Sequence, residues 1–176
     1  MTTMKYSLPP TLEESHQLIR TLAWNNAFGC FTRLGFENWI WPGIADQAKW
    51  IIYFDIDDVH ALNAKYGSYD PVDAMISSVL AAVRMTDYVA GQWKSGDEFL
   101  VCITEDGSRE PSDPEGFKDR LVVELAKQGM TATFSVVPVV TKSLLATVGT
   151  AVRQVYEIKN SRHICGRKEV THSEFE

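Results

Sequence analysis

Two pairs of acidic residues are the part of this sequence best suited to chemistry. Asp55 and Asp57 follow the apolar run over residues 49–54, and Asp97 and Glu98 end a Lys-Ser-Gly-Asp turn signal. Because side chains two residues apart in a strand share a side, the Asp55 and Asp57 carboxylates should lie together. Crowded carboxylates repel unless a cation neutralises them. Magnesium takes oxygen ligands and needs only one or two carboxylates plus substrate phosphates. Either pair alone is more typical of an ordinary turn, but together they favour a metal site.

Three predicted strands must position these acids. The run over residues 49–54 is short, apolar and aromatic, which is typical of a strand buried on both faces. Residues 88–93 and 98–103 flank the turn signal and predict a β-hairpin. If this hairpin pairs beside the buried strand, the two acidic pairs meet at one edge of the sheet.

The rest of the chain predicts helices that alternate with these strands. Thr11 and Glu14 form a capping box that begins the first helix. The further predicted elements are a helix over 34–40 that stops at Pro42-Gly43, a helix after Pro71, a helix over 117–127, a strand over 130–140, a helix from Ser143 to near Asn160, and a short strand over 168–171. This order predicts an α+β class with a ferredoxin-like βαββαβ core and a mostly antiparallel sheet.

Bulk composition excludes several classes of protein. The 176 residues suit one compact domain, and the net charge of −6 argues against a basic face for a nucleic acid polymer. Three cysteines with no CxxC pair indicate free thiols in a reducing compartment. Neither a signal peptide nor a run of about 20 apolar residues is present, so we expect a cytoplasmic protein without a membrane segment.

Four segments, in order along the chain, resemble the GGDEF domains of diguanylate cyclases. Ser-Gly-Asp-Glu-Phe resembles the signature itself, with Ser in place of the first Gly. The other three matches resemble the family's opening L-T-G-L-x-N-R-x-x-F, its D-x-D-x-F-K-x-x-N-D-x-x-G segment and its Y-x-A-K…G-R-N ending. The matching residues are 95–99, 28–36, 55–67, and 155–159 with 166–167. The resemblance implies a palm-type GGDEF fold with a five-stranded sheet over residues 25–176. Residues 1–24 would form a leader and a helix whose apolar stripe is a candidate dimerising element.

The resemblance also implies roles at the acidic residues. Asp55 and Asp97 would hold magnesium or manganese through their carboxylates, and Ile56 through its backbone carbonyl. Glu98 would be a further acid at the metals that helps to deprotonate the attacking 3′-hydroxyl. Gly96 would lie where the backbone approaches phosphate closely.

Other matched positions would bind the nucleotide. Asn63 and Asp73 would contact guanine, and Lys159 would neutralise triphosphate charge, with Arg167 as a weaker candidate. The spacing from Lys159 to Arg167 is longer than in the family, so Arg162 competes for the phosphate role. Without the resemblance, Asn63 is typical of a helix surface or cap, and Lys159 of a helix C-terminus. Arg84 and Asp87 resemble the family's R-x-x-D inhibitory site for the product.

The implied activity is condensation of two GTP into cyclic di-GMP and two pyrophosphates, at half-sites that face each other in a homodimer. Two alternatives remain open: a degenerate domain that binds GTP or cyclic di-GMP without catalysis, and a cyclase that makes another dinucleotide such as cyclic GMP-AMP. The sequence departs from the family pattern at His60, where Lys is common, and at Val152, where an Asp partner for Arg33 is usual.

Overall fold

The computed structural model describes residues 11–81, 88–91, 93–94, 96–105 and 113–170. A six-stranded sheet crosses this part of the chain in the order β1-β2-β4-β5-β3-β6. Its strands are β1 (Trp24–Asn25), β2 (Cys30–Phe31), β3 (Ala48–Ile56), β4 (Tyr88–Ala90), β5 (Glu98–Thr104) and β6 (Ala132–Pro138). All neighbours pair antiparallel except β2 and β4. The mostly antiparallel α+β class is therefore confirmed, with six strands where five were expected.

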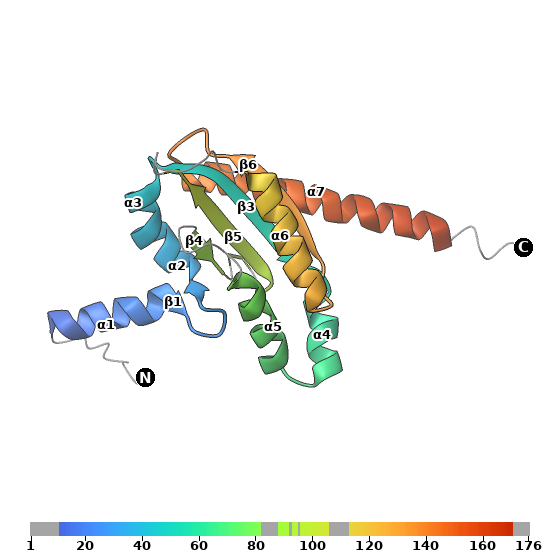
Figure 1. The fold of residues 1–176 in the computed structure, drawn as a ribbon, viewed down its shortest axis with the longest axis horizontal. Helices are drawn as coiled ribbons and strands as arrows, with labels where there is room; N and C mark the ends of the chain where they lie inside the picture. Colours follow the sequence, from blue (N-terminus) through green and yellow to red (C-terminus); the bar gives the residue numbers. More distant parts are fainter. Residues whose placement is uncertain (1–10, 82–87, 92, 95, 106–112, 171–176) are drawn as a thin grey trace, which may run out of the picture.

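Helices cover both faces of this sheet (Figure 1). The helices of the described residues are α1 (Leu12–Ala23), α2 (Arg33–Gly35), α3 (Trp41–Ile44), α4 (Val59–Tyr66), α5 (Asp70–Leu80), α6 (Pro114–Lys127) and α7 (Leu144–Val170), and a π-helical segment η1 (Phe36–Ile40) joins α2 to α3. One core lies between the sheet and α5 with α6, and a second lies between the sheet and α7, η1 and α3. Strand β3 contributes to both, because Ile51, Ile52, Tyr53 and Phe54 are all fully buried.

The capping box at the start of α1 forms as predicted. The Glu14 N–H donates to Thr11 Oγ1 at 3.1 Å, and the Thr11 N–H donates to the Glu14 carboxylate at 3.1 Å. None of the helices in the described part of the chain combines the length and the apolar character that crossing a bilayer requires.

Two predicted helix ends are wrong. Helix α7 continues to Val170, so residues 168–170 are helical and not a strand, while residue 171 lies outside the described residues. The helix after Thr32 passes through Pro42 and ends at Ile44. Pro42 is tolerated because it lies in the first turn of α3, where the missing N–H costs little.

Helix α4 was not predicted at all. It begins after Asp58, whose φ of 56° places it in the left-handed region, and it ends at Gly67, whose φ is 73°. None of its residues is buried, so it has no apolar stripe that could be recognised in the sequence. The two left-handed residues turn the chain sharply at both ends of α4 and direct it from β3 to α5.

Candidate active site

The two acidic segments lie side by side, as the sequence predicted. Strand β3 pairs with β5 so that Asp55 is directly opposite Glu98, and the Ile56 N–H donates to the Asp97 carbonyl at 3.0 Å. Directly opposed residues of an antiparallel pair point to the same face, so the Asp55 and Glu98 side chains share the face covered by α7. Segments more than 40 residues apart thus bring carboxylates together at one end of the sheet.

Helix α7 places a cation on these carboxylates. Its residues Val148, Ala151 and Val155 are buried against the sheet, and Lys159 follows one turn later on the same stripe. Lys159 Nζ lies 2.5 Å from Asp55 Oδ1 and 3.3 Å from an oxygen of Asp57. The side chain of Asp55 is 16% exposed and that of Lys159 is 29% exposed, so this ion pair is only partly screened by water.

The surroundings of Asp55 raise its pKa by more than Lys159 lowers it. Burial raises the pKa of Asp55, Lys159 lowers it, and the nearby charges of Asp97 and Glu98 raise it again. Burial also lowers the pKa of Lys159, but the interactions with Asp55 and Asp57 leave that pKa above its ordinary value. A positive charge is therefore needed at this point to hold the carboxylates together.

Asp57 is held by hydrogen bonds from β6 and the residue before it, and by α7. The hydroxyls of Thr131 and Thr133 donate to its two carboxylate oxygens at 3.0 and 3.1 Å. Arg162 donates to Thr133 Oγ1 at 3.0 Å and approaches Asp57 to 3.9 Å. Because its oxygens are already engaged, Asp57 is better suited to orient Lys159 than to hold a further cation.

Arg162, considered from the sequence as a competitor for the phosphate role, lies at this edge as a second cation. It lies three residues after Lys159, and residues at that spacing share a helix face. This signal becomes usable only if the helix is extended past Asn160. Arg167 lies in α7 as well, but its side chain is outside the described part of the structure, as are Ser95, Arg84 and Asp87 with the predicted product site.

A pocket of about 460 Å³ opens beside the acidic edge. It is lined by Phe28, Val59, His60, Asn63, Tyr69, Asp73, Ile76, Gly96 and Asp97. The structure therefore brings together Asn63 and Asp73, the two residues expected to contact a base, next to an expected metal ligand. Val72, the residue before Asp73, is fully buried in the core, so Asp73 is the residue of this pair that lines the pocket.

Both polar residues of the pocket have unusual environments. Asn63 Oδ1 is buried and has no hydrogen-bond partner in the described part of the structure. Burial, with a smaller contribution from Asp70, raises the pKa of Asp73. An unsatisfied buried acceptor costs free energy unless a ligand or water donates to it. A ligand with several N–H donors would satisfy Asn63 and Asp73 together.

Gly96 lines the same pocket and leaves its surface open. A Cβ built at Gly96 would meet no atom within 4 Å, and its φ is not in the left-handed region. The fold itself therefore does not require glycine at this position. Any requirement for glycine must come from a ligand that approaches the backbone.

The donor set of the acidic edge fits magnesium. Asp55, Asp97 and Glu98 supply carboxylate oxygens, which are the hard ligands that magnesium prefers. Among the described residues, no three His, Cys, Asp or Glu side chains form a ready-made metal cluster. Magnesium does not need one, because it commonly binds through one or two carboxylates and takes its remaining ligands from substrate phosphates and water.

Val152 stands where the resembled family has an Asp partner for Arg33, but Arg33 makes other contacts in this structure. Its guanidinium pairs with Glu37 at 2.9 Å, donates to the Trp93 carbonyl at 3.4 Å and lies 5.0 Å from the centre of the Trp93 ring. The substitution at Val152 therefore leaves no uncompensated charge at Arg33.

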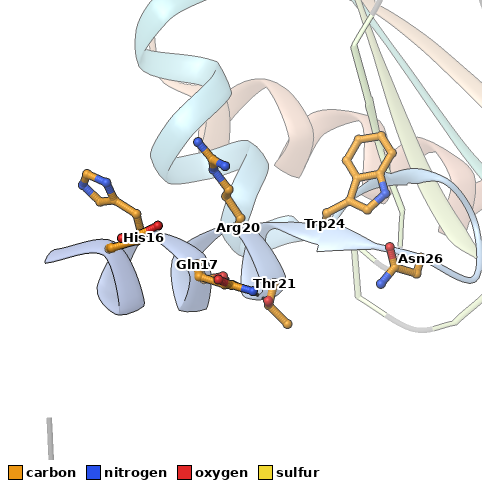
Figure 2. A pocket seen from close by; sticks show the side chains of 7 residues that line it. His16, Gln17, Arg20, Thr21, Trp24 and Asn26 are labelled. Carbon is orange, nitrogen blue, oxygen red and sulfur yellow. Dashed lines mark hydrogen bonds between the residues drawn. The ribbon is translucent and has the colours of Figure 1, made fainter. Parts of the chain in front are cut away.

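A second pocket, of about 600 Å³, runs along α1. Figure 2 shows His16 and Arg20 on the same side of this helix, as their spacing of four residues requires, and Trp24 just after the end of the helix in β1. The lining residues all lie between Glu13 and Asn26, so this is an open groove along one segment. It shares no residue with the pocket beside Asp97.

Solved structures with the same fold are GGDEF-domain proteins. A sensory box/GGDEF family protein from Caulobacter crescentus has a TM-score of 0.63 and 20% identity, over 79% of this chain and 99% of that one. A microbial GGDEF domain, studied for its interaction with bis-(3′,5′)-cyclic di-GMP, has a TM-score of 0.63 and 16% identity, over 80% of this chain and 94% of that one. The diguanylate cyclase SiaD from Pseudomonas aeruginosa, in complex with its activator SiaC, has a TM-score of 0.63 and 17% identity, over 85% of this chain and 63% of that one.

No family model matches the chain, and no curated protein matches it by sequence. The likeness lies in the path of the backbone, over four-fifths of the chain, with few identical residues. The chain therefore has the fold of the GGDEF domains.

Proposed function

We propose that this protein is a magnesium-dependent diguanylate cyclase that condenses two GTP into cyclic di-GMP and two pyrophosphates. The observation that carries the proposal is the pairing of Asp55 with Glu98, beside a pocket in which Asn63 and Asp73 adjoin Asp97. One region thus offers oxygens for a metal and polar groups for a base. The fold supports the proposal, since SiaD, which shares it, is a diguanylate cyclase.

Guanine is the base that suits the pocket best. Its Watson–Crick edge presents two adjacent N–H donors, which a carboxylate such as Asp73 can accept together. The Asn63 amide has an unsatisfied acceptor and can also donate to a ring nitrogen or carbonyl. Adenine offers one exocyclic donor next to a ring acceptor, and that acceptor would face the Asp73 carboxylate without a proton between them. The preference for GTP over ATP would therefore depend on Asp73.

The acidic edge would hold the triphosphate. Asp55, Asp97 and the Ile56 carbonyl would bind magnesium, which, when bound, supplies positive charge to the attacking and leaving oxygens. Lys159 would neutralise phosphate charge, because its ammonium is already among these carboxylates and is mobile enough to exchange partners. Arg162, on the same helix face, would be a second such cation.

In the reaction, the 3′-oxygen of each GTP attacks the α-phosphorus of the other. Two O3′–P bonds form, two bonds between α-phosphorus and bridging oxygen break, and two pyrophosphates leave. Glu98 would accept the proton from the 3′-hydroxyl, since it lies opposite Asp55 at the same edge. One chain provides one such set of residues, so two chains with antiparallel nucleotides would be needed to close the cyclic product.

A nucleotide-binding module without catalysis is the second candidate, and His60 is the observation that favours it. His60 lines the pocket at a position where the resembled family commonly has Lys. An imidazole at this position replaces the fixed positive charge of that Lys near the phosphates. Such a domain would bind GTP or cyclic di-GMP and leave GTP intact.

The test is incubation of the purified chain with GTP and magnesium, with products separated by chromatography and identified by mass. We expect cyclic di-GMP and pyrophosphate in a ratio of one to two, no product from Asp97→Asn, and normal product from the surface control Asp46→Asn. A mixture of ATP and GTP tests for cyclic GMP-AMP. Binding of GTP without any product would favour the binding module. The absence of both binding and product would refute both candidates.

A further inference from the structure

Tyr69 is a pocket residue to which neither the sequence nor the resemblance assigned a role. It lies in the short turn between α4 and α5, and its side chain is 68% exposed although it lines the pocket with Asn63 and Asp73. Within the described part of the chain, its side chain makes no hydrogen bond and no ring contact. A large aromatic ring at the rim of a polar pocket is thus left without a partner.

The turn places the backbone of Tyr69 close to the two residues that would contact a base. The Gly67 N–H donates to the Asn63 carbonyl, and the Asp73 N–H donates to the Tyr69 carbonyl, both at 2.9 Å. The positive φ of Gly67 reverses the chain in the space of three residues. The backbone of Tyr69 is therefore held at the start of α5, two residues after the Gly67 cap of α4.

The rest of the pocket wall supplies an apolar counterpart. Phe28 and Ile76 line the pocket and are buried, at 4% and 1% exposure. Phe28 is held in place by an edge-to-face contact with Phe99, at 5.3 Å between ring centres. The pocket thus combines buried apolar wall, polar groups at Asn63 and Asp73, and one exposed aromatic ring. A planar heterocycle has apolar faces and polar edges, which matches these three features.

We propose that Tyr69 stacks on the face of the bound nucleobase and so determines affinity for the base, while Asp73 determines which base is bound. This proposal rests on the proposed function, because it takes the pocket beside Asp97 to be the base site. Every base has an aromatic face, so the contribution of Tyr69 is the same for guanine and adenine.

The experiment compares two ligands that share phosphate chemistry and differ in the base. Calorimetry in the presence of magnesium measures binding of a non-reactive GTP analogue with an α,β-methylene bridge, the matching ATP analogue, and inorganic tripolyphosphate. The proteins are the intact wild-type chain, Tyr69→Ala, Tyr69→Phe and Asp73→Asn. Tyr66→Ala is the matched control, because Tyr66 is exposed on α4 nearby and does not line the pocket.

We expect Tyr69→Ala to weaken binding of both nucleotide analogues by about 10-fold, the range of one lost base stack, and to leave tripolyphosphate unchanged. Tyr69→Phe keeps the ring and should bind like the wild type, as should Tyr66→Ala. The ratio of GTP to ATP affinity should change in Asp73→Asn and not in Tyr69→Ala.

Unchanged nucleotide binding by Tyr69→Ala would overturn the role of Tyr69 and leave the proposed function standing. An equal loss for tripolyphosphate would overturn it too, since it would indicate a general disturbance of the site. If the wild type binds tripolyphosphate as tightly as the GTP analogue, or binds neither, the assignment of the base pocket fails, and the role of Tyr69 fails with it.

Discussion

Replacement of Lys159 by Met should destabilise the protein, because it leaves carboxylates together without their cation. Met has a similar length and keeps the apolar contacts of the side chain, so the change removes mainly the charge. In the structure Lys159 contacts Asp55 at 2.5 Å and Asp57 at 3.3 Å, and Glu98 lies directly opposite Asp55. The charge repulsion that Lys159 now offsets would act on the folded state alone.

The expected loss follows from how far the pair is buried. Exposed pairs contribute about 0–1 kcal/mol, and removal of one partner from a fully buried pair costs about 3–5 kcal/mol. Asp55 and Lys159 lie between these limits, at 16% and 29% side-chain exposure. We therefore expect a loss of roughly 2 kcal/mol, which corresponds to about 4–8 °C in Tm for a domain of this size.

Urea unfolding followed by tryptophan fluorescence measures this loss. The matched control is Lys142→Met, which removes a cation from its pair with Asp46, where both side chains are 77% exposed. That variant should change the free energy of unfolding by less than about 0.5 kcal/mol. The slope of the free energy against urea should be the same in all three proteins, because the area exposed on unfolding does not change.

Magnesium provides the second arm of this experiment. If the acidic edge binds a divalent cation, millimolar magnesium should stabilise Lys159→Met more than the wild type, since the metal replaces the missing charge. Restoration by magnesium but not by an equal ionic strength of sodium chloride would identify the site. A Lys159→Met variant as stable as the wild type, and insensitive to magnesium, would refute the account of this edge.

Three further predictions test other parts of the account. Gly96→Ala should change the free energy of unfolding by no more than about 0.5 kcal/mol, since the added Cβ meets no described atom, yet it should weaken GTP binding in calorimetry. Gly43→Ala, also in open space, should bind GTP normally. An equal loss of GTP affinity in both variants would contradict the close approach of a ligand to Gly96. Asp58→Val should lower the free energy of unfolding by about 1–2 kcal/mol, because a β-branched residue is strained at the φ of 56° found there, whereas Asp58→Gly should not. Equal losses of stability in urea unfolding would argue against a left-handed residue at this position. The stability difference between wild type and Lys159→Met should begin to fall at about pH 10.4, the ordinary pKa of lysine, and disappear as the pH rises through the raised folded pKa of Lys159. It should also shrink in acid as Asp55, whose pKa is raised, becomes protonated. A difference independent of pH would exclude an ionic origin.

The signs of that pH dependence follow from the two shifts. The pKa of Lys159 is raised in the folded state, so its contribution is complete below the unfolded value and is lost as the pH rises through the folded value. The pKa of Asp55 is also raised, so the folded protein holds that proton more tightly than the unfolded chain does. Stability therefore falls as the pH rises from about 4 through the folded pKa of Asp55.

The sequence predicted the sheet edge because the signals there are local and strong. Residues 49–54 are apolar on both faces, and the turn signal before Asp97 joins two strands of similar length. When β3 and β5 pair in the observed register, Asp55 lies opposite Glu98, and no other element is needed to bring them together. The capping box at Thr11 and the start of α7 near Ser143 were predictable for the same reason, since a few neighbouring residues determine them.

The features that sequence reasoning missed depend on weak or distant signals. Helix α4 has no buried side chain, and helical periodicity is visible only where one face is apolar. The extension of α7 crosses only one helix-weakening residue, Gly166, and a single glycine costs about 1 kcal/mol without ending a helix. The place of Arg162 on the same helix face as Lys159 was therefore not predicted, because the helix that carries both was expected to end near Asn160.

Some properties of the pocket have no sequence signal at all. The unsatisfied oxygen of Asn63 and the exposure of Tyr69 depend on which elements surround them. That Asp73 lines the pocket becomes clear only when the neighbouring Val72 is seen in the core. The roles of these residues toward a nucleotide stay predictions.

The most direct test of the central claim is calorimetric binding of a non-reactive GTP analogue with and without magnesium, to the wild type and to Asp97→Asn. If the acidic edge and the pocket form one magnesium–GTP site, the wild type binds the analogue tightly only with magnesium, and Asp97→Asn loses that magnesium-dependent gain. Affinity that does not depend on magnesium, or that is the same in Asp97→Asn, would contradict the claim.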